Sequence, residues 1–169
     1  MEYRKRVEKL LLSSERKGME KLLVWMADNG YYDEPDGDCQ SSPAGGSLAA
    51  QSLYVLGIME DMAYLLLHDN EETLEAKRNS LAVCALLHRI GILGTGAEGT
   101  EEAEAEKRAV SIVSAFISLG KEEERALLCN EIVGHDFTAN MGTAGMDFAL
   151  LLFFAEKWMA NEGKNGVKG

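Results

Sequence analysis

Three apolar helical stretches of this sequence each carry one polar side chain that could take part in chemistry: Gln51, His88 and Glu156. Their apolar neighbours at helical spacing are Val55, Ile58 and Met62 for the first, Leu81, Cys84 and Ala85 for the second, and Ala149, Leu152 and Phe153 for the third. A buried polar group loses its hydration and therefore needs hydrogen-bond partners inside the protein. We expect these three side chains to meet in the interior.

The dipeptide His135-Asp136 also joins an imidazole to a carboxylate. It follows Gly134 in a segment that is expected to connect two helices, where an aspartate typically turns or caps the backbone. The alternative is that both residues flank the same pocket as His88 and Glu156.

Other reactive or charged residues have structural explanations. Cys84 and Cys129 lie in apolar helical patterns without a nearby histidine, so we expect buried small side chains and neither a disulfide nor a metal site. The acidic run from Glu98 to Glu106 is predicted to be the solvated start of a helix, where carboxylates complement the helix dipole.

Three passages of the sequence carry a recognisable pattern in a fixed order: GGSLAAQSLYVLGIM (45–59), SLAVCALLHRIGILG (80–94) and MDFALLLFFAEKW (146–158). Together they resemble the HD-domain phosphohydrolase family. The family pattern is a helix with G-G-L-x-x-H-S, a helix ending A-L-L-H-D-I-G and a last helix ending in A-D. Three separate motifs in the right order are a far more specific signal than a lone dipeptide. The resemblance implies an HD-domain-like helical bundle.

The metal ligands of the family are mostly replaced here. In phosphohydrolases of the family, the first His, the His-Asp pair and the final Asp hold a divalent metal. Gln51 stands at the position of the first His, His88 matches, Arg89 replaces the Asp and Glu156 replaces the final Asp. A guanidinium stays charged and cannot ligate, so Arg89 puts a cation where the metal needs an anion. We expect no metal cofactor and no catalytic residue, with His88 and Glu156 as the residual candidate ligands.

The resemblance therefore implies a degenerate, catalytically inactive relative. Its pocket, formed by Gln51, His88, Arg89 and Glu156 with His135 and Asp136, is expected to bind a small phosphate-containing anion or a protein partner. The alternative is a metal-dependent phosphohydrolase that acts on nucleotides or other phosphomonoesters. A further hypothesis is that Arg89 and Glu156 form a buried ion pair in place of the metal.

Helical spacing of apolar residues runs through most of the chain, and no strand pattern competes with it. The sequence therefore predicts an all-α bundle with an N-terminal helical extension. The expected helices span 2–28 with a break at Ser13-Ser14, 47–67 with Ser47 as N-cap, 71–77, 81–90, 101–119, 121–133 and 143–161.

Composition limits the organisation and the partners. With 169 residues, 46% of them hydrophobic, we expect one domain over 1–162, with an N-terminal helix and loop (1–46), a core (47–162) and a flexible tail (163–169). The net charge of −11 argues against nucleic acid. No apolar run is long enough for a leader or a membrane span, so we expect a cytoplasmic protein. The basic N-terminal residues could support a homo-oligomer through complementary charge.

Overall fold

A computed structural model describes residues 2–33, 46–66, 71–94, 102–130 and 148–165, and these residues are helical with short connections. No strand occurs among them, which confirms the all-α prediction. The α-helices are α1 (Glu2–Leu12), α2 (Met19–Asp28), α3 (Leu48–Leu66), α4 (Glu71–Leu87), α5 (Glu102–Ser114), α6 (Lys121–Leu127) and α8 (Phe148–Asn165), and the 3₁₀ turn η1 spans Ile90–Ile92.

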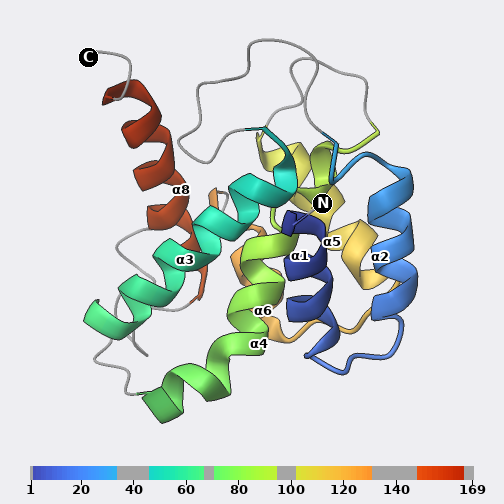
Figure 1. Ribbon diagram of the computed structural model, residues 1–169, viewed down its shortest axis with the longest axis horizontal. Helices are drawn as coiled ribbons and strands as arrows, with labels where there is room; N and C mark the ends of the chain where they lie inside the picture. Colours follow the sequence, from blue (N-terminus) through green and yellow to red (C-terminus); the bar gives the residue numbers. More distant parts are fainter. Residues whose placement is uncertain (1, 34–45, 67–70, 95–101, 131–147, 166–169) are drawn as a thin grey trace.

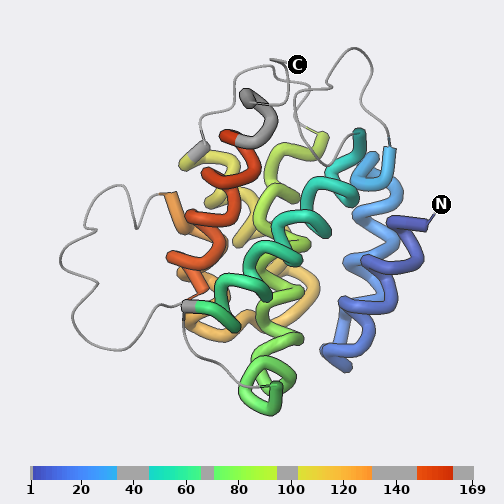
Figure 2. The backbone as a smooth tube through the Cα atoms, turned by 60° about the vertical axis from the view of Figure 1, so that its left-hand side comes forward, coloured from blue at the N-terminus to red at the C-terminus, as the bar shows by residue number. Residues whose placement is uncertain are grey.

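Helix α4 is the centre of the bundle. It packs along α3 and also contacts α1, α6 and α8, so that α1 and α2 lie on one side and α8 on the other (Figures 1 and 2). Its second half, Leu81 to Leu87, is buried at all seven positions. A helix that is apolar on every face is stable only when neighbours surround it. This half therefore fixes the position of the residues that follow it.

The prediction of two separate helices over 71–77 and 81–90 is wrong, because α4 is continuous. The polar residues Arg78, Asn79 and Ser80 suggested a break, but none of them is a glycine or a proline that would end a helix. The first half of α4 is mostly exposed and the second half is buried. The change in composition marks the place where one helix enters the core.

The predicted break near Ser13-Ser14 is confirmed. Their hydroxyl groups donate to the carbonyls of Leu10 and Leu11 at 2.7 and 2.6 Å, which satisfies acceptors at the end of α1. Helix α2 starts after Gly18, whose φ of 94° and close approach to a backbone carbonyl leave no space for a Cβ. Both helices contribute buried residues to the core, namely Val7, Leu11, Met19, Leu22, Leu23 and Met26.

The bounds of the remaining helices differ from the expectations by a few residues. Ser47 caps α3 as predicted, since its Oγ accepts the N–H of Ala50 at 3.3 Å. Helix α5 ends at Ser114 instead of residue 119, and α8 continues to Asn165, so residues 163–165 are helical rather than part of a tail. None of the described helices combines the length and the apolar character that crossing a lipid bilayer requires.

An ion pair between Arg16 and Glu123 joins the α1–α2 connection to α6. The guanidinium donates to both carboxylate oxygens, one of them at 2.7 Å from Nη1, and Nη1 also donates to the Ser118 carbonyl at 3.0 Å. The Glu123 side chain is 4% exposed and also accepts the Gly120 N–H at 2.8 Å. Burial works to raise the pKa of this carboxyl, but Arg16 and its other hydrogen-bond partners hold that pKa below its usual value. The pair is called the Arg16 clip below.

Candidate functional site

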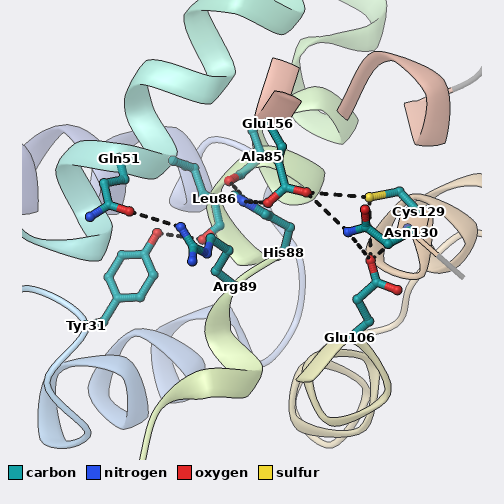
Figure 3. A network of polar contacts seen from close by, with 10 residues as sticks. All are labelled: Tyr31, Gln51, Ala85, Leu86, His88, Arg89, Glu106, Cys129, Asn130 and Glu156. Carbon is teal, nitrogen blue, oxygen red and sulfur yellow. Dashed lines mark hydrogen bonds and ion pairs between the residues drawn. The ribbon is translucent and has the colours of Figure 1, made fainter. Parts of the chain in front are cut away.

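The end of α4 leaves carbonyl groups that have no helical partner, and two side chains satisfy them. The Ala85 carbonyl lies 2.7 Å from Nδ1 of His88, and the Leu86 carbonyl accepts the hydroxyl of Tyr31 at 2.5 Å. Tyr31 itself is fully buried. These contacts fix the end of α4 and orient the His88 ring that follows it (Figure 3).

The second nitrogen of His88 faces the carboxylate of Glu156 on α8. Because a carbonyl only accepts hydrogen bonds, Nδ1 carries the proton that faces Ala85. Nε2 then lies 3.1 Å from Glu156 Oε1, and the two groups form an ion pair when the ring is protonated. His88 is 7% exposed, so this nitrogen is inaccessible to bulk water.

Arg89 turns away from Glu156. Its Nη1 donates to Oε1 of Gln51 on α3 at 3.1 Å, and Gln51 Nε2 donates to the Gly46 carbonyl at 3.2 Å. Figure 3 shows the guanidinium on the α3 side of His88 and Glu156 on the other side. The hypothesis of a direct Arg89–Glu156 ion pair is therefore wrong, since the ion pair of Glu156 in the described part of the chain is with His88.

Arg89 still affects Glu156 through its charge. Burial works to raise the pKa of the Glu156 carboxyl, but His88, Arg89 and Lys157 together lower that pKa to about 2. The side chain is 19% exposed. Glu156 is therefore an ionised carboxylate at neutral pH, stabilised by the positive charge of its neighbours.

A second carboxylate, Glu106 on α5, lies on the other side of the same cluster. Its Oε1 accepts the backbone N–H of Asn130 at 2.8 Å and the side-chain amide of Asn130 at 3.0 Å. The same amide nitrogen lies 3.5 Å from Glu156 Oε2, and the Cys129 thiol lies 3.6 Å from Glu106 and 3.9 Å from Glu156. Asn130 thus bridges the two carboxylates.

The surroundings of the Cys129 thiol favour its protonated form. Burial and the two neighbouring carboxylates raise its pKa far above the ordinary value. Cys84 is fully buried, and burial raises its pKa as well. The expectation that both cysteines are buried small side chains is confirmed.

A cavity of about 140 Å³ opens among these groups, between the residues that follow α4, the turn η1, helix α5, the residues that follow α6, and helix α8. A cavity of about this size accommodates a single small ring or a few water molecules. It is called the α4 pocket below, and its lining residues are His88, Arg89, Ile92, Ala105, Glu106, Cys129, Asn130 and Glu156.

Gly91 allows α5 to approach the pocket. It lies in η1, and a Cβ on this residue would be 1.9 Å from the carbonyl oxygen of Ala105 and 2.7 Å from the amide nitrogen of Ala109. Only glycine permits this backbone contact. The close packing of η1 on α5 brings Glu106 to the same site as His88.

Of the four described residues that the sequence assigned to one pocket, His88, Arg89 and Glu156 line the α4 pocket, whereas Gln51 does not line it and contacts Arg89. Gln51 lies on α3, His88 and Arg89 follow α4, and Glu156 lies on α8. His135 and Asp136 were also predicted to flank the pocket, and both lie outside the described residues.

Sequence reasoning missed Glu106, Cys129 and Asn130 as lining residues. The prediction that Glu106 belongs to a solvated helix start is wrong, because this residue is only 6% exposed. A signal was present: Ala103, Ala109, Val110 and Val113 follow helical spacing around Glu106 and place it on an apolar face. The neighbouring acidic residues concealed this periodicity.

The side chains of the pocket do not fit a divalent metal. Among the residues that the structure describes, no group of three or more His, Cys, Asp or Glu side chains is arranged to hold a metal ion. Gln51 offers its carbonyl oxygen to Arg89 instead, and the guanidinium can neither ligate nor lose its charge.

Comparison of the chain with models of protein families, with curated proteins and with solved structures finds no match.

Proposed function

We propose that this protein is a catalytically inactive relative of the HD-domain phosphohydrolases that binds a small phosphate-containing ligand in the α4 pocket. One observation carries the proposal: the four positions that correspond to metal ligands are paired with one another. Gln51 accepts from Arg89, and His88 faces Glu156. Side-chain pairing takes the place that metal coordination has in active members of that family.

The charge of Arg89 favours an anion over a metal. A cation near the metal position repels a divalent ion, and in a partly buried site this repulsion costs on the order of several kcal/mol of binding free energy. The same guanidinium has several N–H groups and uses one of them for Gln51. Its remaining donors suit the oxygens of a phosphate group, which arginine binds in a charge-assisted manner.

The small volume of the pocket favours a small molecule over a protein partner. A cavity of about 140 Å³ accepts a phosphate group with a short substituent, whereas protein partners bind flatter and larger surfaces. Each carboxylate of the pocket has a partner: Asn130 donates to Glu106, and His88 faces Glu156. Their negative charges therefore do not prevent an anion from binding beside Arg89.

Phosphate binding to the purified protein tests the proposal. Isothermal titration calorimetry with methyl phosphate should show binding that Arg89→Gln weakens about tenfold, because one charge-assisted contact is lost. Arg78→Gln, on the exposed part of α4, is the matched control and should bind like the unchanged protein. Equal affinity of the two variants would refute the role of Arg89.

Metal analysis of the same protein separates the inactive relative from the enzyme. We expect no stoichiometric manganese or other divalent ion and no phosphatase turnover in manganese. Bound metal together with turnover that His88→Gln abolishes would overturn the proposal and favour the metal-dependent phosphohydrolase.

The family resemblance has its own test. A triple variant with Gln51→His, Arg89→Asp and Glu156→Asp restores the metal ligands of the family at the matching motif positions. If the three motifs are those of an HD domain, this variant should gain manganese binding that the unchanged protein lacks. A correctly folded variant without manganese affinity would count against the resemblance.

A further inference from the structure

Helix α1 has a basic outer face in a chain whose net charge is −11. One of its basic residues, Arg4, pairs with Glu8 on the next turn. Three others are exposed and form no ion pair in the part of the chain that the structure describes: Lys5, Arg6 and Lys9. Leu12, at the end of the helix, is 43% exposed. Lys5, Arg6, Lys9 and Leu12 are called the basic α1 face below.

The end of α3 and the start of α4 form a surface of the opposite sign. These two helix ends lie at the same end of the bundle (Figures 1 and 2), and Arg78 Nε on α4 lies 3.6 Å from Glu60 Oε1 on α3. One turn beyond Glu60, Tyr64 and Leu65 are 58% and 67% exposed. Four carboxylate residues at this end are also exposed: Asp61, Glu71, Glu72 and Glu75. Together these six residues, Tyr64, Leu65 and the four acidic ones, are called the acidic end.

Most of the carboxylates of the acidic end lack a cation. Arg78 is shared by Glu60 and Glu75 and is therefore already engaged. The remaining three have no ion pair with any residue that the structure describes: Asp61, Glu71 and Glu72. Exposed apolar side chains with a charged surround are typical of protein contact surfaces.

We propose that the basic α1 face of one copy of this chain docks on the acidic end of a second copy. Complementary charge identifies the second copy as the occupant, because each surface carries the cations or anions that the other lacks. Leu12 can then pack on Tyr64 and Leu65, which removes exposed apolar area from water. The inference goes beyond the proposed function, since neither surface contains a residue of the α4 pocket.

The two kinds of contact have different tasks. Single exposed ion pairs contribute little to affinity, so the charged residues set orientation and association rate, and the apolar residues supply most of the binding free energy. Both contributions can be removed separately, because the side chains concerned are exposed and their replacement leaves the core unchanged.

Sedimentation velocity of the full chain tests the association itself. At about 0.1 M salt, the protein should shift from monomer to dimer as its concentration rises. At about 1 M salt, where the Debye length falls from about 10 Å to about 3 Å, the dimer should be weaker. A monomer at every concentration in low salt would refute the proposal.

Charge reversal identifies the two surfaces. Lys5→Glu with Lys9→Glu gives one variant, and Asp61→Lys with Glu72→Lys gives the other, and each alone should associate at least about tenfold more weakly than the unchanged protein. A mixture of the two variants should regain association, because the altered face of each matches a surface of the other. A mixture that stays monomeric would overturn the pairing of these surfaces.

A matched control separates the α1 surface from net charge. Lys17→Glu with Lys21→Glu makes the same change in charge at exposed positions beside the start of α2 and should leave association unchanged. An equal loss in this control would show that net repulsion, rather than the basic α1 face, decides the association.

The apolar contribution has its own pair of variants. Leu65→Ser should weaken the dimer about tenfold, since an exposed leucine that is buried on docking is lost. Val24→Ser removes a side chain on α2 that is 61% exposed and lies outside both surfaces, so it should associate normally. Unchanged association of Leu65→Ser would contradict the docking on α3.

Discussion

Two clusters of buried charge hold helices of this bundle together, and they differ in whether a cavity opens among the charged groups. In the Arg16 clip, a planar guanidinium meets both oxygens of Glu123, while Ser118 and Gly120 contribute backbone groups. In the α4 pocket, the carboxylates of Glu106 and Glu156 border a cavity of about 140 Å³, with Asn130 between them and His88 beside Glu156.

This difference distinguishes a structural role from a binding role. A buried ion pair in which each atom has a partner orders the chain and has little capacity left for a ligand. A buried charge cluster that borders a cavity leaves space beside its charged groups, which a small ligand requires. On this basis we propose a folding role for the Arg16 clip and a binding role for the α4 pocket.

Loss of the Arg16 clip should have the largest effect on stability. Arg16→Ala leaves the buried Glu123 carboxylate without its cation, which should cost about 3 to 5 kcal/mol of unfolding free energy. Urea denaturation followed by circular dichroism measures it. Arg78→Ala removes two ion pairs of a largely exposed side chain, with Glu75 and Glu60, and should cost less than about 1 kcal/mol. Similar losses in both variants would contradict the structural role of the clip.

Substitution of Gly91 should have an intermediate effect on stability, because this residue lies where η1 packs on α5 next to the pocket. Gly91→Ala places a methyl group against the backbone of Ala105, so η1 and α5 must separate, at about 1 to 3 kcal/mol. Gly57→Ala, in open space within α3, should instead stabilise the protein by about 0.5 to 1 kcal/mol. Thermal unfolding of the two variants should thus shift in opposite directions, and a common direction would count against the close contact.

The acid dependence of stability gives the smallest and most specific effect. Glu156 has a folded pKa of about 2 and a reference value of 4.5, so its stabilisation is present above the reference value and is lost as the pH falls through the folded pKa. Between about pH 5 and about pH 3.5, the unchanged protein should lose on the order of 1 kcal/mol more than Glu156→Gln. Parallel pH profiles of the two proteins would show that Glu156 does not gain from His88.

Much of the site could be predicted from single polar residues on apolar helical faces. Gln51, His88 and Glu156 each interrupt an otherwise apolar face, and burial of those faces forces the three side chains toward a common interior. Glu106 escaped the same reasoning because its acidic neighbours resemble the solvated first turn of a helix. Periodicity, rather than local composition, was the informative signal there.

The pairing of Arg89 could not be predicted. Its long side chain can reach either Gln51 or Glu156 from the same backbone position, and only the packing of α3 against the end of α4 decides between them. The continuity of α4 was equally hidden, since the polar residues before Leu81 gave no indication that the helix continues into the core.

The sequence by itself determined the helical class, the polar residues that had to be buried and the permanent cation at Arg89, because these follow from residue chemistry and from helical periodicity. The tertiary structure decided which charges meet. Glu106 reaches the pocket only through the backbone contact at Gly91, and His88 faces Glu156 only because the end of α4 lies beside α8. Contacts between residues far apart in the chain depend on how helices pack against one another, which no local pattern specifies.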